Sequence, residues 1–156
     1  MEKTYQELLN SKKYQVFIMS SPVPFPLNYG IHLWFVINLK GKIHRIEFGN
    51  FNGSPHKDGI GLLKDFLPLT KGMNMFFFKR NLRFESKIED YIEGKKNSDA
   101  FELATFILEQ YEEYPLKNEY RLLGPNSNSF IGWILKQFPK IKMNISFRAV
   151  GLNYKF

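Results

Sequence analysis

Apolar and polar residues form several short runs separated by proline, glycine and asparagine, a pattern typical of β-strands joined by turns. The run KYQVFIMS, residues 13–20, mixes aromatic and β-branched residues and predicts a strand. Prolines follow, so residues 22–30 are expected to form an extended surface loop. Between Ile31 and Phe48, two β-rich runs flank a lysine and a glycine, which predicts an antiparallel hairpin.

Helical spacing is clearest in DAFELATFILEQYEEY, residues 99–114, which follows Ser98 as an N-cap residue and ends at Pro115. A second helix is expected to start in the segment PNSNSF, residues 125–130, and to carry Trp133 and Phe138. Short helices are predicted near residues 5–10 and over residues 61–69. Residues 73–86 predict a strand or long ribbon, and residues 140–156 a final strand with a terminal extension.

The composition predicts a single domain over residues 1–156, because 44% of the residues are apolar and 17% are aromatic. The N-terminus has no apolar signal region, and no apolar run is long enough to cross a membrane, so a cytoplasmic protein is expected. Lysine and arginine number 22 against 15 acids, which gives a charge of +7 and favours anionic partners. The basic residues are scattered, as on a solvated surface.

Some chemistry is excluded by what the chain lacks. With no cysteine it has neither disulfides nor thiolate metal ligands nor a thiol nucleophile. The sequence has neither a GxGxxG fingerprint nor a Walker A motif, so no nucleotide cofactor is expected. His56 completes a set of three evenly spaced histidines, which raises a zinc site as an alternative, although its loop context is typical of an exposed residue.

The segment PNSNSF has two interpretations. Asn126 or Ser127 caps the helix, or the hydroxyl of Ser127 is a nucleophile at the helix start. A serine nucleophile needs a base within hydrogen-bond reach, and the base needs an orienting partner. His32 and His44 lie on the two arms of the predicted hairpin and are the candidates for these roles.

The hairpin register decides whether the two histidines meet, because a one-residue slip turns a side chain to the other face. A turn centred on Leu39 places His44 opposite Trp34 and about 7 Å from His32, measured between backbones. A turn centred on Lys40 separates the histidines by about 13 Å. A loop with an even number of residues puts them on opposite faces, and the sequence leaves these three registers open.

Three segments carry a resemblance to a known group of proteins: GIHLWFVI, KIHRIEF and YRLLGPNSNSF. Their order resembles the circularly permuted papain-like superfamily, which includes NlpC-like proteins, lecithin:retinol acyltransferase-like proteins and H-Rev-type phospholipase/acyltransferases. The segments GPNSNSF and AVGLNY are also similar to a bacterial domain family with a signature near GPNSNTF. The resemblance implies an α+β fold with an antiparallel sheet of about five or six strands and helices packed on one side.

The resemblance also implies a site in which Ser127 replaces the nucleophilic cysteine, His32 is the general base and His44 orients it. A serine hydroxyl stays protonated at a helix start and depends on its base more than a cysteine does. Two functions follow: a hydrolase or acyltransferase acting on lipid, peptide or other acyl substrates, or an inactive binding module that retains the cleft. Residues expected to border the substrate are Tyr29, Trp34, Asn126 and Asn128.

A third function rests on the segment MFFFKRNLRF, which interleaves aromatic and basic residues as in proteins that bind RNA or anionic lipid. The same alternation is typical of phenylalanines entering a core while basic residues face water, and we favour that interpretation. The acids Glu89, Asp90 and Glu93 are expected to be solvated.

Overall fold

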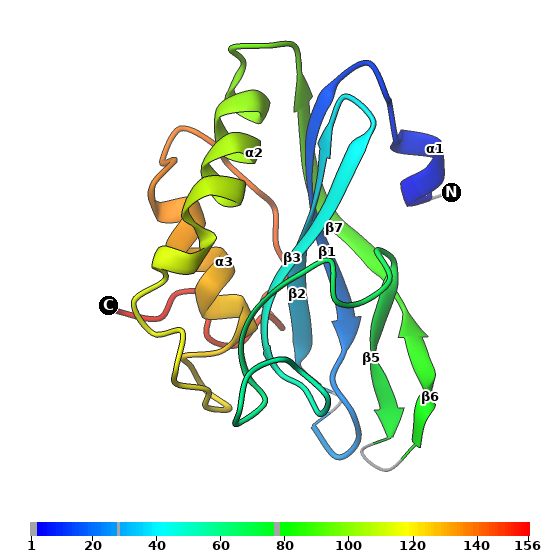
Figure 1. Cartoon of the computed structure of the whole chain (residues 1–156), viewed down its shortest axis with the longest axis vertical. Coiled ribbons are helices and arrows are strands. Elements are labelled where there is room, and N and C mark those ends of the chain that lie inside the picture. The colour runs from blue at the N-terminus through cyan, green and yellow to red at the C-terminus, as the bar shows by residue number, and fades with distance from the viewer. Residues whose placement is uncertain (1–2, 28, 77–78) are drawn as a thin grey trace.

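The computed structural model describes residues 3–27, 29–76 and 79–156 and has the predicted α+β class (Figure 1). An antiparallel sheet has five strands in the order β4-β3-β2-β1-β7, and β5 and β6 form a separate two-stranded ribbon. The strands are β1 (Tyr14–Pro22), β2 (Ile31–Leu39), β3 (Lys42–Asn50), β4 (Ile60–Lys64), β5 (Lys71–Phe76), β6 (Lys79–Glu85) and β7 (Lys87–Gly94). The helices are α1 (Tyr5–Leu8), α2 (Asp99–Gln110) and α3 (Ser127–Lys136), and a 3-10 turn (Tyr111–Glu113) follows α2.

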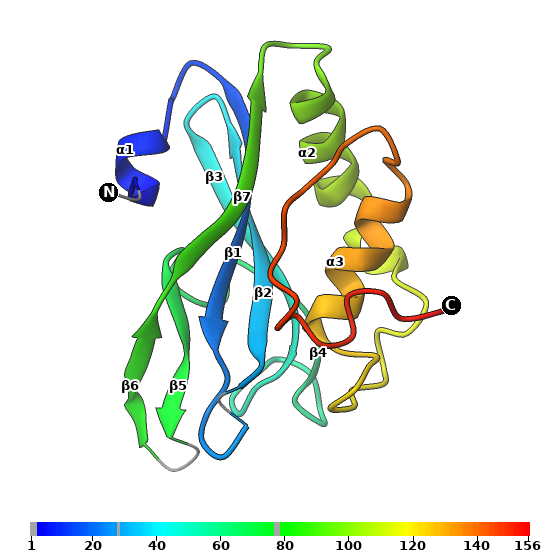
Figure 2. The ribbon, with the colours of Figure 1, turned by 180° about the vertical axis from the view of Figure 1, so that it is seen from behind.

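The two faces of the sheet have separate cores. Leu33 and Phe35 of β2 pack in the larger core with residues of α2 and α3, such as Leu103. Trp34 and Val36 point the other way, into a smaller core that includes residues of α1. We call the side covered by α2 and α3 the helix face, and the side carrying α1 and the β5–β6 ribbon the hairpin face (Figures 1 and 2). The predicted packing of helices on one side therefore holds for α2 and α3, whereas α1 lies opposite.

The predicted hairpin is present, and its register separates the two histidines. Leu39 pairs with Lys42 across a two-residue turn in which Lys40 has φ 52° and Gly41 has φ 95°. Positive φ at both positions is typical of the tight turns that match the twist of a hairpin. This even-numbered loop pairs His44 with Ile37 of the helix-face core. His32 lies instead on the hairpin face beside Trp34, so the predicted histidine pair does not form.

Of two other segment predictions, one is wrong and one is confirmed. Residues 61–69 were expected to be helical, but β4 (Ile60–Lys64) adds to the sheet beside β3, with Leu62 and Leu63 buried. An apolar run this short fits a strand as well as a helix, and sheet pairing decides between them. Residues 73–86 do form a ribbon, divided into β5 and β6.

The C-terminal segment lacks the predicted strand but still covers an edge of the sheet (Figure 2). It runs beside β7, where the Asp90 carboxylate accepts the Asn144 N–H at 2.7 Å and the Glu89 carboxylate accepts the Ser146 N–H at 2.9 Å. Side-chain acceptors thus replace a backbone ladder. Glu89 and Asp90, expected to be solvated, are half-buried, and both acids hold this segment.

No helix in the part of the chain that the structure describes combines the length and apolar character needed to cross a membrane.

Candidate functional site

Helix α3 starts with a complete cap. The Oδ1 atom of Asn126 accepts the backbone N–H groups of Asn128 at 3.0 Å and Ser129 at 3.2 Å. In return, the Asn126 N–H donates to the Ser129 hydroxyl at 3.3 Å. These bonds satisfy N–H groups that a helix start otherwise leaves unpaired. The capping interpretation of PNSNSF is confirmed, and Asn126 is the capping residue.

Asn128 joins this helix start to the sheet at the end of β2. The pairing of β2 with β3 covers Phe35–Leu39, so Ile31 and Leu33 lie beyond it. The Asn128 side chain serves both of them: its Oδ1 accepts the Leu33 N–H at 3.1 Å and its Nδ2 donates to the Ile31 carbonyl at 2.9 Å. One amide side chain therefore takes the place of a neighbouring strand.

The same residues hold the C-terminal loop. Asn126 and Asn128 each donate to the Val150 carbonyl, at 3.1 and 2.9 Å, and the Ser129 hydroxyl donates to the Gly151 carbonyl at 2.8 Å. Gly151 has φ +91°, and a Cβ there would lie 2.8 Å from the Asn126 side chain. The segments GPNSNSF and AVGLNY are thus bonded to each other. Asn126 and Asn128 were expected to bind substrate, but their side-chain polar atoms form hydrogen bonds that hold the fold.

A cavity of about 280 Å³ lies beside this helix start. Its described wall contains no aspartate, glutamate, lysine or arginine. Pockets of this kind, apolar with a few polar groups, bind small molecules, and this one is at the small end of their size range. Its polar residues are His32, Tyr120, Asn126, Ser127 and Asn128. Its apolar wall includes Val23, Leu27, Tyr29, Leu122, Leu123 and Val150.

Ser127 lines the cavity and is only 2% exposed. Its hydroxyl donates to Oδ1 of Asn128 at 3.2 Å. Burial raises the pKa of the Tyr120 hydroxyl, and its proximity to Ser127 opposes that shift. Neither His32 nor His44 is among the described hydrogen-bond partners of Ser127.

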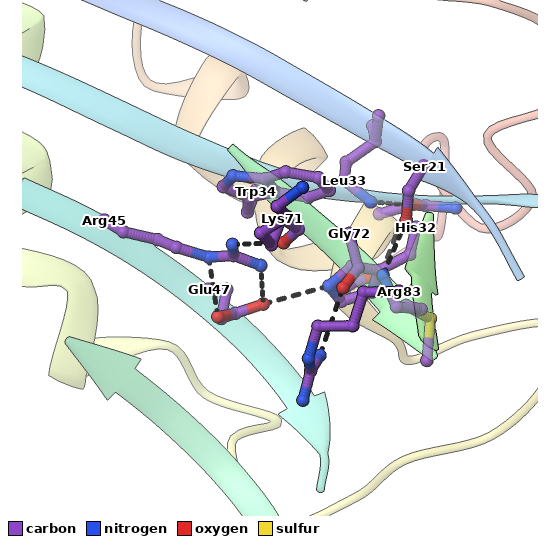
Figure 3. A network of polar contacts seen from close by, with 12 residues as sticks. Ser21, His32, Leu33, Trp34, Arg45, Glu47, Lys71, Gly72 and Arg83 are labelled. Carbon is purple, nitrogen blue, oxygen red and sulfur yellow. Dashed lines mark hydrogen bonds and ion pairs between the residues drawn. The ribbon is translucent and has the colours of Figure 1, made fainter. Parts of the chain in front are cut away.

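The imidazole of His32 is held instead by a buried ion pair on the hairpin face (Figure 3). Its Nε2 lies 3.1 Å from Oε2 of Glu47, and the Glu47 carboxylate lies 2.8 and 2.9 Å from Nε and Nη2 of Arg45. All three side chains are about 1% exposed. The guanidinium also lies 4.2 Å from the Trp34 ring centroid and donates to the carbonyl of Lys71 at 2.6 Å, tying β5 to the sheet.

The charges of this network follow from its contacts. Burial alone would raise the pKa of Glu47, but the hydrogen bond from His32 and the charge of Arg45 outweigh it and hold this pKa below its ordinary value. Because an ionised carboxylate only accepts hydrogen bonds, Nε2 of His32 carries a proton. The other ring nitrogen of His32, Nδ1, is buried without a hydrogen-bond partner among the described residues.

Sequence reasoning missed Glu47 and Arg45. They are two residues apart on β3, so their side chains share a face of the sheet. The sequence pattern that could have indicated this ion pair is two oppositely charged residues at alternate positions of a β-rich run. The partner of His32 proves to be Glu47, whereas the sequence predicted His44.

The remaining candidates lie outside the cavity or at its mouth. Nδ1 of His44 contacts Asp65 at 2.7 Å, and Trp34 donates to the Leu69 carbonyl at 3.0 Å on the hairpin face. Tyr29 is 67% exposed at the mouth. Nε2 of His56 lies 2.9 Å from the Leu62 carbonyl, and the described residues include no cluster of three potential metal ligands.

The fold and the cavity define an α+β domain with a small, uncharged apolar site at the start of a helix. The chain matches the family described as "Protein of unknown function (DUF3750)" over residues 13–154, and it belongs to this family. Comparison with curated proteins gave no match, and comparison with solved structures gave none either.

Proposed function

We propose that this domain binds a small, uncharged ligand with an apolar body in the cavity beside α3. The observation that carries the proposal is the composition of the cavity wall. This wall is mostly apolar, and its described residues include no aspartate, glutamate, lysine or arginine. A charged ligand would lose its hydration there without gaining an opposite charge. Tyr120 and Ser127 contribute hydroxyl groups to this wall, and these groups can orient the ligand.

Binding without catalysis fits the contacts of Ser127. A serine nucleophile must pass its proton to a base, yet this hydroxyl donates to Asn128, and the base candidate His32 is bonded to Glu47 on the hairpin face. We extend the proposal to the permuted papain-like fold. Support comes from the order of a histidine strand, a hairpin and a helix that starts at Ser127 beside an antiparallel sheet. The domain would then be an inactive member that retains the cleft.

Filling the cavity is expected to abolish ligand binding. Straight-chain alcohols of about six to ten carbons serve as probes, and at 100 times the dissociation constant a bound probe should add about 2.7 kcal/mol to the free energy of unfolding. The variant Val150→Trp places an indole at the wall and should remove the rise in Tm caused by the alcohols. Leu82→Trp, at an exposed site on β6, is the matched control and should retain it. No rise for the wild-type protein, or an equal rise for both variants, would contradict the proposal.

A second candidate function is hydrolysis or acyl transfer by Ser127. It is favoured by one observation: His32 and Ser127 border the same cavity, and Nδ1 of His32 is buried without a partner among the described residues. In this reaction the Ser127 oxygen bonds to the acyl carbon, Nδ1 takes the hydroxyl proton, and the leaving group departs with that proton. Water or an acceptor alcohol then releases the acyl group by the same route. Glu47 would position His32.

Covalent labelling separates the two candidates. A fluorophosphonate probe is expected to leave the wild-type protein unlabelled between about pH 5 and 9, because the hydrogen-bond partners described for Ser127 include no base. Intact-protein mass spectrometry measures the adduct. If the wild-type protein is labelled while Ser127→Ala is not, the second candidate replaces the first. The variant Ser129→Ala is the control, because it tests whether the probe labels the neighbouring serine at this helix start.

A further inference from the structure

Large apolar side chains are exposed around the mouth of the cavity. Folded proteins rarely expose several such residues in one place unless the surface contacts an apolar environment. We call the five most exposed of these the apolar rim. The members and their exposed fractions are Phe25 (70%), Tyr29 (67%), Leu122 (61%), Leu123 (73%) and Phe147 (84%).

The rim is one surface built from three loops. Tyr29, Leu122 and Leu123 line the cavity. The rings of Tyr29 and Phe147 have centroids 6.5 Å apart. Phe25 belongs to the turn closed by the bond from the Leu27 N–H to the Pro24 carbonyl at 2.9 Å. The rim therefore borders the cavity at Tyr29, Leu122 and Leu123, Phe147 adjoins it through Tyr29, and Phe25 precedes Pro26 of the cavity wall.

Basic residues stand beside the rim. Arg121, next to Leu122, has a side chain that is 70% exposed and pairs with Glu119 at 3.2 Å. The guanidinium of Arg148 lies 5.8 Å from the Tyr29 ring centroid. With a chain charge of +7, the surface around the rim suits an anionic partner.

We propose that the apolar rim docks the domain on an anionic bilayer surface and that the ligand enters the cavity from the bilayer. This inference rests on the proposed function. Phenylalanine, leucine and tyrosine side chains that project from separate loops enter a fluid interface without needing a surface of matching shape. Neighbouring arginines are attracted to anionic headgroups. An apolar ligand would then reach the cavity without crossing water.

Vesicle sedimentation of the full chain tests this proposal. Bound protein is measured with phosphatidylcholine vesicles and with vesicles in which about a third of the lipid is phosphatidylglycerol. We expect binding to the anionic vesicles that weakens as salt rises. The double variant Leu122→Ser/Leu123→Ser should bind about tenfold more weakly. Leu82→Ser, which is 48% exposed on β6 and does not line the cavity, should bind as the wild-type protein does.

Several results would overturn the docking proposal. These are an absence of wild-type binding to anionic vesicles, equal binding by the double variant, or a wild-type dimer in sedimentation velocity that the double variant abolishes. The last result would assign the rim to a second copy of the chain. Thermal unfolding checks that the double variant folds, and Phe147→Ser repeats the test at a separate loop. The rise in Tm caused by alcohols, measured without vesicles, distinguishes the two proposals. If the wild-type protein shows no such rise, the proposed ligand-binding cavity is contradicted. If it shows the rise but does not bind vesicles, only the docking proposal is contradicted.

Discussion

Replacing Glu47 with alanine is expected to lower the free energy of unfolding by about 3–5 kcal/mol, because it leaves Arg45 charged and buried without its partner. The guanidinium would keep its bonds to backbone carbonyls but lose the carboxylate that offsets its desolvation. His32 would also lose the acceptor of its Nε2 proton. Equilibrium urea denaturation measures the change.

The matched control is Glu85→Ala. Glu85 also pairs with a basic residue, Lys71, but its side chain is 75% exposed, so this change should cost less than about 1 kcal/mol. Similar losses for the two variants would show that the Glu47 network does not hold the fold. Glu47→Gln retains the shape of the side chain and isolates the effect of its charge.

The pKa of Glu47 gives this prediction a pH dependence. Because its folded-state pKa lies below its unfolded value, the stability it contributes is present above the unfolded pKa and is lost as pH falls through the folded pKa. Between neutral pH and acid, the wild-type protein should therefore lose stability more steeply than Glu47→Gln. Parallel stability curves for the two proteins would contradict this assignment.

Replacing Asn128 with alanine is expected to cost at least about 3 kcal/mol, because three backbone groups lose a partner at the junction of α3, β2 and the C-terminal loop. These groups are the Leu33 N–H and the carbonyls of Ile31 and Val150. Urea denaturation measures the loss, and hydrogen exchange at the Leu33 amide should show local opening of the end of β2.

Two further variants make the Asn128 test specific. Asn118→Ala changes an exposed asparagine and should alter stability by less than about 0.5 kcal/mol. Asn128→Asp keeps an acceptor for the Leu33 N–H but turns a carboxylate oxygen toward two carbonyls, so it should be as damaging as alanine. A loss for Asn128→Ala no larger than that for Asn118→Ala would mean that the side chain does not join helix to sheet.

The pairing of the strands explains why the motif with the strongest resemblance does not form the expected triad. The two-residue turn at Lys40–Gly41 turns His44 toward the helix face, and His32 stays on the hairpin face. His44 then contacts the carboxylate of Asp65, and His32 contacts that of Glu47. Ser127 contacts Asn128 and Tyr120 in their place.

Local patterns in the sequence were enough to predict several elements. The hairpin between Ile31 and Phe48, the helix that Ser98 caps and the cap at the start of α3 all depend on residues a few positions apart. Their spacing and capping chemistry act within one turn or one strand. Local patterns did not predict β7, because its acidic residues are typical of a solvated segment. Only in the folded chain do these acids accept hydrogen bonds from the C-terminal segment.

The tertiary structure alone decided the chemistry of the site. Asn128 bonds to Ile31 across 97 positions of sequence, and His32 meets Glu47 across 15. Sequence spacing does not specify such pairs, because the length of one turn determines which face each strand residue takes. The sequence by itself therefore determined an α+β domain with a capped helix at residue 127. Folding determined that the groups around Ser127 hold the chain together and enclose an apolar cavity, because buried polar atoms take the partners that strand pairing brings to them.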